Sequence, residues 1–63
     1  MNGLRRAREH RALTQAELAE RAGVMPATIS RLENGQQRAY PSTVRKLAKA
    51  LGVEPALLYG EDD

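Results

Sequence analysis

The amino-acid sequence predicts a small all-α protein, a compact domain of five helices. Five segments carry apolar residues at helical spacing, whereas apolar and polar residues alternate too briefly for a strand and β-branched residues are few. A chain of 63 residues is near the lower limit for a domain that folds alone, so most helices must contribute to one thin core. Cysteine is absent, which excludes disulfides and thiolate zinc sites and leaves helix packing to stabilise the fold.

The first two helices have recognisable ends. The first is expected from about Gly3 to Arg11, with Asn2 as its N-cap. The second begins at Thr14 in the stretch "TQAE", where the Thr14 hydroxyl and the Glu17 carboxylate can form a capping box. It ends at Gly23, because glycine readily adopts the left-handed conformation that follows many helices.

The other three helices are separated by glycine and proline. The third, residues 26–34, lies between two glycines, and Pro26 suits its first turn, where a missing N–H costs nothing. The fourth follows Pro41-Ser42, ends at Gly52 and has one apolar face, formed by Val44, Leu47, Ala48 and Leu51. The fifth is short and runs from Glu54-Pro55 to Gly60.

The third helix has two unlike faces. At about 100° per residue, Ile29 and Leu32 fall on an apolar side with Met25 between them. The opposite side has no apolar bulk and bears Ala27, Ser30, Arg31 and Asn34. Because the turn at Gly23 is so short, the second and third helices must cross steeply. Arg31 is then expected to point away from the protein.

These features, in this order and spacing, resemble the phage-repressor and Cro-type helix-turn-helix family, the XRE-like group. The matching stretches span nearly the whole chain and are "LRRARE", "LTQAELAERAGV", "TISRLENG", "PSTVRKLAKALGV" and "LLYG". The resemblance implies a compact five-helix repressor-like domain that places its third helix in the major groove of DNA. It also implies binding to operators as a dimer.

The resemblance assigns roles to individual side chains. Four residues stand where the family usually faces bases or adjoining phosphates: Pro26, Ala27, Thr28 and Arg31. Four more are expected at the DNA backbone: Gln15, Ser30, Asn34 and Arg38. Gln15 also stands where it can brace the third helix. Arg31 is the sharpest candidate for base reading, because its planar fork matches guanine O6 and N7.

The chain also departs from the family pattern. Met25 stands where the family often has Ser or Thr as a helix cap, and methionine cannot cap. Pro26 and Ala27 stand where Gln, Arg or Ser is frequent. Ala27 either meets a thymine methyl group or is small so that the helix can approach the DNA closely.

Glu33 falls near the apolar side of the third helix, and a buried carboxylate needs a cationic partner. Arg8 falls on the inward side of the first helix, the side of Leu4. The family pairs residues at these two positions. We therefore predict a structural Arg8–Glu33 salt bridge that ties the first helix to the third.

The distribution of charge suits a polyanionic partner. The net charge is +2 for the whole chain, but all ten Lys and Arg and only five of the eight acidic residues lie in residues 1–60, a net charge of +5. Such an excess fits nucleic-acid binding as well as a merely solvated surface. We expect one domain over residues 1–60 and an acidic tail over residues 61–63.

The residues argue against catalysis, a metal or a cofactor. His10 is a single histidine expected at the surface, and the sequence has no Gly-rich phosphate loop and no carboxylate pair set apart in a cleft. No apolar run approaches the roughly 20 residues of a membrane span, and no signal peptide is recognisable. We expect a cytoplasmic, nucleoid-associated protein that is not an enzyme and has no evident small-molecule ligand.

The sequence therefore predicts sequence-specific binding of double-stranded operator DNA by a prokaryotic transcriptional regulator, a repressor. One helix contacts few base pairs, so a homodimer on half-sites about 34 Å apart is expected. One alternative is the DNA-binding antitoxin of a toxin–antitoxin pair. Another is a protein-interaction module that docks through the fifth helix. In that helix the residues Leu57 to Tyr59 are core, a dimer seam or both.

Overall fold

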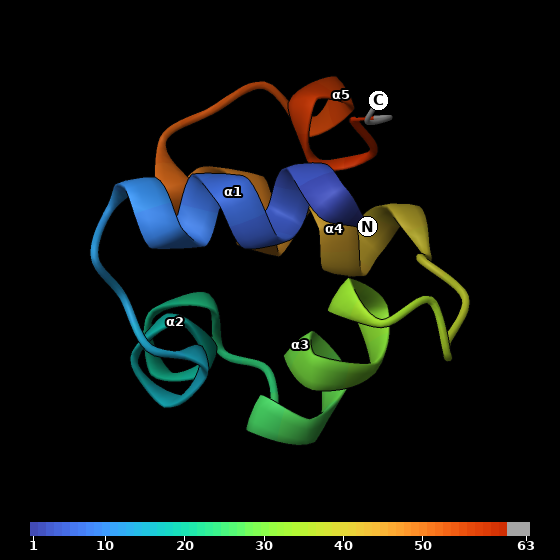
Figure 1. Ribbon diagram of the computed structural model, residues 1–63, viewed down its shortest axis with the longest axis horizontal. Helices are drawn as coiled ribbons and strands as arrows, with labels where there is room; N and C mark the ends of the chain where they lie inside the picture. Colours follow the sequence, from blue (N-terminus) through green and yellow to red (C-terminus); the bar gives the residue numbers. More distant parts are fainter. Residues whose placement is uncertain (61–63) are drawn as a thin grey trace.

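Five α-helices and no strand make up residues 1–60, the part of the chain that the computed structural model describes (Figure 1). In chain order they are α1 (Asn2–His10), α2 (Gln15–Ala22), α3 (Pro26–Glu33), α4 (Pro41–Leu51) and α5 (Pro55–Leu58). The all-α prediction is confirmed, and each helix lies close to its expected position. None of these helices is long and apolar enough to cross a membrane. The predicted acidic tail, residues 61–63, lies outside the described residues.

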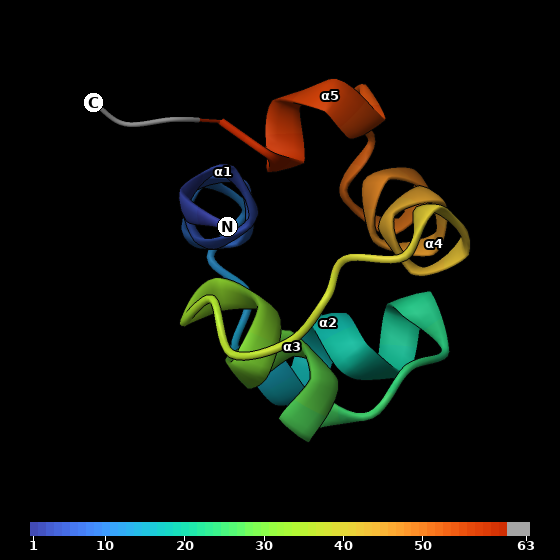
Figure 2. The same ribbon diagram turned by 90° about the vertical axis from the view of Figure 1, so that its right-hand side faces the viewer.

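The helices are arranged so that α3 lies at an edge of the molecule. In both views α1 and α4 lie between α5 on one side and the pair of α2 and α3 on the other (Figures 1 and 2). α5 packs on both α1 and α4, whereas α2 packs on α3 and α4. The third helix is therefore held from behind by α1 and α2 and lies on the side opposite to α5.

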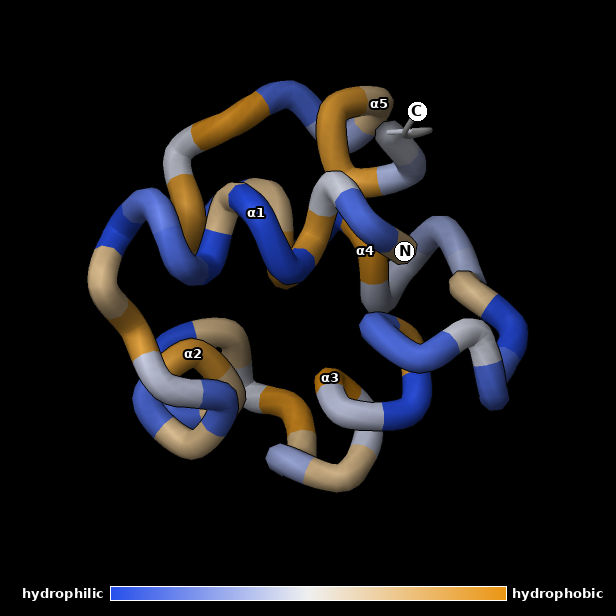
Figure 3. The backbone as a smooth tube through the Cα atoms, in the orientation of Figure 1, coloured by the Kyte–Doolittle hydropathy of each residue, from blue (hydrophilic) through white to orange (hydrophobic). Residues whose placement is uncertain are grey.

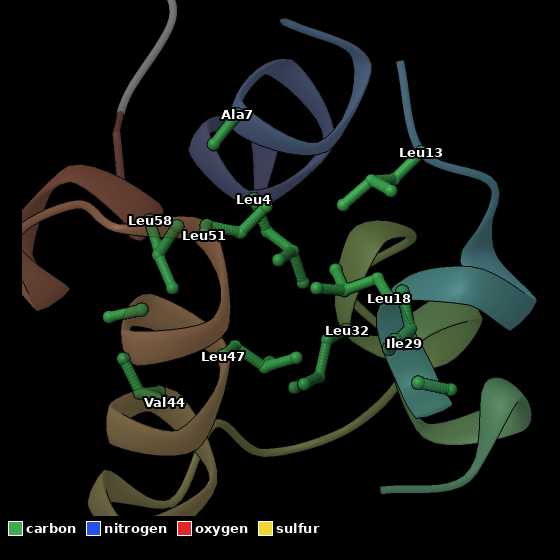
Figure 4. Close-up of a cluster of buried hydrophobic side chains, with 12 residues drawn as sticks. Leu4, Ala7, Leu13, Leu18, Ile29, Leu32, Val44, Leu47, Leu51 and Leu58 are labelled. Carbon is green, nitrogen blue, oxygen red and sulfur yellow. The ribbon is translucent and has the colours of Figure 1, made fainter. Parts of the chain in front are cut away.

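Apolar side chains from all five helices form one core (Figure 4). The large side chains that are fully buried are Leu4, Leu18, Ile29, Leu32, Val44, Leu47, Leu51 and Leu58. The four longer helices, α1 to α4, also carry hydrophilic residues, which is the amphipathic pattern that predicted them (Figure 3). Burial of one such apolar side chain contributes about 1.5–3 kcal/mol, so this cluster is the main source of the domain's stability.

The predicted ends of α2 are both present. The Thr14 hydroxyl accepts a hydrogen bond from the Glu17 amide at 3.0 Å, and the Glu17 carboxylate accepts one from the Thr14 amide at 2.8 Å. Gly23 follows the helix with a φ of 73°. Since this left-handed conformation ends α2 and only Gly23, Val24 and Met25 separate it from α3, the chain turns a corner between the two helices.

The start of α1 differs from its prediction. Asn2 is not the N-cap but the first residue of the helix, and Met1 takes the cap position without a side-chain hydrogen bond. The Met1 amino group instead donates to the carbonyl of Leu32 at 2.7 Å. That carbonyl belongs to the last turn of α3, where carbonyls lack partners within the helix. The contact links the first residue of the chain to α3 and accompanies the earlier start of α1.

Gly3 allows α1 and α5 to approach at the level of the backbone. A Cβ atom on Gly3 would overlap the carbonyl oxygen of Leu57 and would lie 2.8 Å from the Gly60 nitrogen. No side chain fits in this space without moving α5. The helical pattern of the sequence treats Gly3 only as the beginning of a helix and does not reveal this role.

Candidate nucleic-acid interface

The interface begins with the outer face of α3. Ile29 and Leu32 have no exposed surface and hold the other side of the helix in the core, so the remaining face points outward. Three of the predicted base-reading residues are exposed: Pro26, Ala27 and Arg31. Thr28, the fourth, is half-buried, as is Ser30. The structure therefore brings these side chains together on the accessible part of one helix.

Arg31 is the basic residue of α3 and lies in its last turn. Its side chain is exposed, and it forms no ion pair with another described residue. A guanidinium carries five N–H donors in a planar fork. The predicted outward position of Arg31 and the predicted corner at Gly23 are confirmed, and the fork is available to a partner outside the protein.

Glu33 ends α3 and is buried among donors from α1 and α2. Arg8 donates from Nε to Oε2 at 2.6 Å and from Nη2 to Oε1 at 3.0 Å, which makes a two-point ion pair. Gln15 donates to Oε1 at 3.0 Å, and Arg5 Nε lies 3.5 Å from the same oxygen. The predicted Arg8–Glu33 salt bridge is present, and it joins α1, the start of α2 and the end of α3.

This network sets the ionisation of its members. Burial raises the pKa of Glu33, but the hydrogen bonds from Arg8 and Gln15, together with the positive charge of Arg8, outweigh burial and hold that pKa below its usual value. The hydrogen bond to Glu33 raises the pKa of Arg8. Both groups are thus charged at neutral pH, and the carboxylate serves as a fixed anchor rather than as an acid or base.

Gln15 and Asn34, both expected at the DNA backbone, are partly engaged within the protein. Gln15 uses its amide nitrogen to bond Glu33, so its expected bracing role is confirmed. Asn34 follows α3 as its C-cap and accepts a hydrogen bond from Arg5 Nη2 at 3.0 Å through Oδ1. Each amide nitrogen has two hydrogens, so both residues can still donate to a phosphate. Their phosphate contacts stay predictions.

The loop from α3 to α4 carries further positive charge next to the end of α3. The chain between the two helices is hydrophilic over most of its length (Figure 3). Arg38 is exposed, and its guanidinium carbon lies 5.2 Å from the centre of the Tyr40 ring. A cation over an aromatic face is attracted by the electron density of the ring. Tyr40 therefore helps to hold Arg38 at the surface beside α4.

Met25 does not lie on the inward, apolar side where the helical wheel puts it. It precedes α3 and has extended backbone angles, φ −85° and ψ 145°, so helical spacing does not apply to it. Its side chain is 70% exposed. As expected of methionine, it forms no capping hydrogen bond. The outer surface of α3 therefore continues past Pro26 onto an exposed methionine, which pattern reasoning missed.

Residues on the side away from α3 offer no metal centre. Among residues 1–60 no group of three or more His, Cys, Asp or Glu side chains could hold a metal ion. His10 is exposed, as expected, beside a hollow of about 680 Å³ between α1 and α5.

Leu58 belongs to the core, whereas Leu57 and Tyr59 are 55% and 47% exposed. The fifth helix thus combines a core residue with exposed apolar neighbours.

A helix pair joined through a left-handed glycine, with the second helix exposed at the edge of a small helical bundle, is the arrangement of a helix-turn-helix domain. Residues 4–58 match the family model described as Helix-turn-helix. The chain therefore belongs to this family. The match runs from Leu4 of α1 to Leu58 of α5 and so includes the whole core.

Curated relatives in this family are regulators. The chain is 49% identical over 51 residues to the HTH-type transcriptional repressor RghR of Bacillus subtilis (strain 168), an overlap that covers 79% of this chain but only 38% of that protein. It thus spans well under half the length of that relative. It is also 43% identical over 61 residues to an uncharacterized HTH-type transcriptional regulator of Methanothermobacter thermautotrophicus (strain Delta H), covering 87% of this chain and 88% of that protein.

A solved structure shows the same fold. The restriction-modification controller protein C.AhdI from Aeromonas hydrophila is similar to this chain with a TM-score of 0.86 and 33% sequence identity, over 90% of this chain and 86% of that one. The family match and the solved structure together show that the chain has a helix-turn-helix fold, and the relatives that it matches are named as transcriptional regulators.

Proposed function

We propose that this domain binds operator DNA sequence-specifically, with α3 in the major groove, and that it represses transcription. The observation that carries the proposal is the exposure of Arg31 on one side of α3 while Ile29 and Leu32 are buried on the other. The major groove is wide enough to admit an α-helix, and its base edges differ for all four base pairs. The relative RghR is named as a transcriptional repressor, which supports repression rather than activation.

Base reading is assigned to the outer face of α3. Arg31 donates two hydrogen bonds to guanine O6 and N7, a pairing that discriminates against other bases by about 1–3 kcal/mol. Pro26, Ala27 and Thr28 are short and allow the backbone of α3 to come close to the base edges. None of these three side chains is large enough to keep Arg31 out of the groove.

Phosphate contacts are assigned to residues on both sides of α3. Gln15 at the start of α2, Ser30 within α3, Asn34 at its end and Arg38 in the following loop donate to phosphate oxygens. The net charge of +5 over residues 1–60 supports electrostatic attraction to DNA, because each neutralised phosphate releases counterions. These contacts set the register of the protein without carrying sequence information.

The Glu33 network gives the interface its rigidity. Arg5 bonds both Glu33 and Asn34, so the end of α3 and the first loop residue are held against α1. Gln15 bonds the same carboxylate from α2. The residues assigned to DNA therefore stand on a frame that does not need to reorganise on binding, which reduces the entropic cost of association.

We assign a homodimer to the DNA-bound state, in the cytoplasm of a prokaryotic cell. A single α3 contacts few base pairs, and two-fold dimers of this motif bind half-sites about 34 Å apart. Leu57 on α5 and Tyr59 just after it are exposed, on the side opposite to α3. A second copy that covers them leaves both α3 helices free for DNA.

The proposal is tested by titrating a bound operator with the Arg31→Ala and Arg38→Ala variants at several salt concentrations. Arg38→Ala is expected to weaken binding to all sequences alike and to lower the slope of log K against log salt by about 1. Arg31→Ala is expected to relax the preference at one base pair in each half-site. Fluorescence anisotropy with labelled duplexes measures both effects.

Arg11→Ala is the matched control, because Arg11 lines the hollow between α1 and α5, away from α3. It should leave base preference unchanged and alter the salt slope less than Arg38→Ala does. If Arg31→Ala changes neither affinity nor base preference, α3 does not read DNA through this residue and the proposed function is wrong.

A further inference from the structure

The exposed methionine that precedes α3, Met25, contributes neither to the core nor to the capping of the helix. Met25 is 70% exposed, so it adds nothing to the core. It also occupies the N-cap position without a capping bond, although Ser, Thr, Asp or Asn at this position would stabilise the helix. The position therefore holds a residue that serves neither burial nor capping, at the end of the helix assigned to DNA.

The chemistry of the surrounding surface narrows what this residue can contact. The first turn of α3 starts with Pro26 and Ala27, both exposed, and neither these nor Met25 has a side-chain donor. Base edges in the major groove are read by hydrogen bonds, with one apolar feature, the C5 methyl group of thymine. An apolar tip that enters the groove can therefore gain binding energy and selectivity only at thymine.

The location of Met25 also fits DNA better than a protein partner. Figure 1 shows the start of α3 at the lower edge of the molecule, away from α5. Two other exposed apolar residues, Leu57 and Tyr59, lie next to each other on or beside α5, and Tyr40 lies against Arg38. Met25 is thus separate from the surface assigned to a second copy.

We infer that Met25 is a specificity-determining residue that packs its side chain on the C5 methyl group of a thymine in each operator half-site. This inference rests on the proposed function and names the base that its helix prefers. Met25 precedes the first turn of α3, whereas Arg31 lies in its last turn. The thymine and the guanine are therefore expected at different base pairs of the half-site.

The test removes single methyl groups from DNA. An operator is first selected from random duplexes with the wild-type domain, and each thymine is then replaced in turn by deoxyuridine, which differs only by lacking the methyl group. At one position in each half-site, the wild-type dissociation constant should rise about three- to five-fold, as expected for one unburied methyl group. Replacement by 5-bromouracil, which restores an apolar group at C5, should restore binding.

The same series with three variants identifies the contacting residue. Met25→Ala should bind the thymine and uracil operators equally, whereas Met25→Leu, which keeps an apolar side chain, should still distinguish them. Ala27→Gly should also still distinguish them. Thermal melting followed by circular dichroism verifies that each variant is folded.

Three results would overturn the inference. The first is an operator in which no thymine is sensitive to loss of its methyl group. The second is a Met25→Ala variant that keeps the wild-type sensitivity, and the third is loss of sensitivity in Ala27→Gly alone. In all three the domain still binds its operator, so the proposed function survives. If the wild-type domain enriches no DNA sequence, the proposed function fails and the inference fails with it.

Discussion

At the scale of single residues, the buried carboxylate of Glu33 depends on the side chains that surround it. Its side chain has no exposed surface, and the partner Arg8 is only 13% exposed. The pair is retained because each charge is matched by the other, because Gln15 and Arg5 also donate to Glu33, and because Arg8 also donates to the Leu13 carbonyl. Removal of either Arg8 or Glu33 leaves the other charge unpaired in the interior, where it is poorly solvated.

Glu33→Ala and Arg8→Ala should each lower the free energy of unfolding by about 3 kcal/mol, because each leaves one buried charge without its partner. For a domain of this size such a loss approaches the whole stability. Urea and thermal denaturation followed by circular dichroism measure it. Arg11→Ala serves as the control and should change stability little, because Arg11 is exposed and directly follows α1. If Glu33→Ala and Arg8→Ala are both as stable as the wild type, the salt bridge has no structural role.

The same carboxylate predicts a pH dependence. The pKa of Glu33 is lower in the folded protein than its usual value, so the folded state favours the charged form. Its stabilising contribution is complete above the unfolded pKa of about 4.3 and is lost as the pH falls through the folded pKa. Stability of the wild type should therefore decline below about pH 4.3.

Denaturation curves recorded between neutral and acidic pH measure this decline. The Glu33→Gln variant removes the titrating group while keeping its shape, and its stability should fall less over the acidic range than that of the wild type. A Glu33→Gln curve with the same acidic slope as the wild type would assign the decline to other carboxylates, such as Glu17, whose pKa is lowered by its bonds to Thr14.

At the scale of elements, the contact between α1 and α5 depends on a missing side chain. Gly3→Ala should destabilise the domain by about 1–3 kcal/mol, as overpacking of a close contact does, because a Cβ atom there would overlap the Leu57 carbonyl. Helix propensity alone predicts the opposite sign, since Ala favours helices over Gly. Thermal denaturation decides between them, and a stabilised Gly3→Ala variant would show that α5 yields without cost.

The helices themselves were predictable because their signals are local. The capping box of Thr14 and Glu17, the left-handed Gly23 and Gly52, and the apolar spacing of α4 each act within a few residues. The failures occurred where the cause is distant in sequence. Asn2 lies inside α1 rather than at its cap, and Met1 in the cap position bonds to Leu32 of α3, while Gly3 is required by α5.

At the scale of the whole molecule, the surface proposed for DNA and the surface proposed for a second copy lie apart in space. The outer face of α3 lies on one side, and the exposed apolar residues Leu57 and Tyr59 lie on or beside α5 on the other. α1 and α4 lie between them and carry much of the core. Association through α5 therefore need not obstruct DNA, and the Glu33 network, which connects α1, α2 and α3, sets how α3 is presented.

The candidate site, like the helices, was predictable in part from the sequence. The resemblance to a family places Arg31, Ala27 and Pro26 on the outer face, and charge pairing predicts Arg8 with Glu33. The helical wheel failed at Met25, because that residue is not in the helix and its extended backbone turns the side chain outward. Nor does periodicity reveal that Arg5 joins Glu33 and Asn34, since contacts between helices depend on their packing.

The most direct test of the central claim, that α3 reads bases through Arg31, is parallel selection of bound sites from random DNA with the wild type and with Arg31→Ala. The account predicts that the wild type enriches two inverted half-sites about 34 Å apart, each with a defined guanine. Arg31→Ala should enrich the same half-sites with that guanine position randomised. Identical base preferences for the two proteins, or no enriched sequence for the wild type, would contradict it.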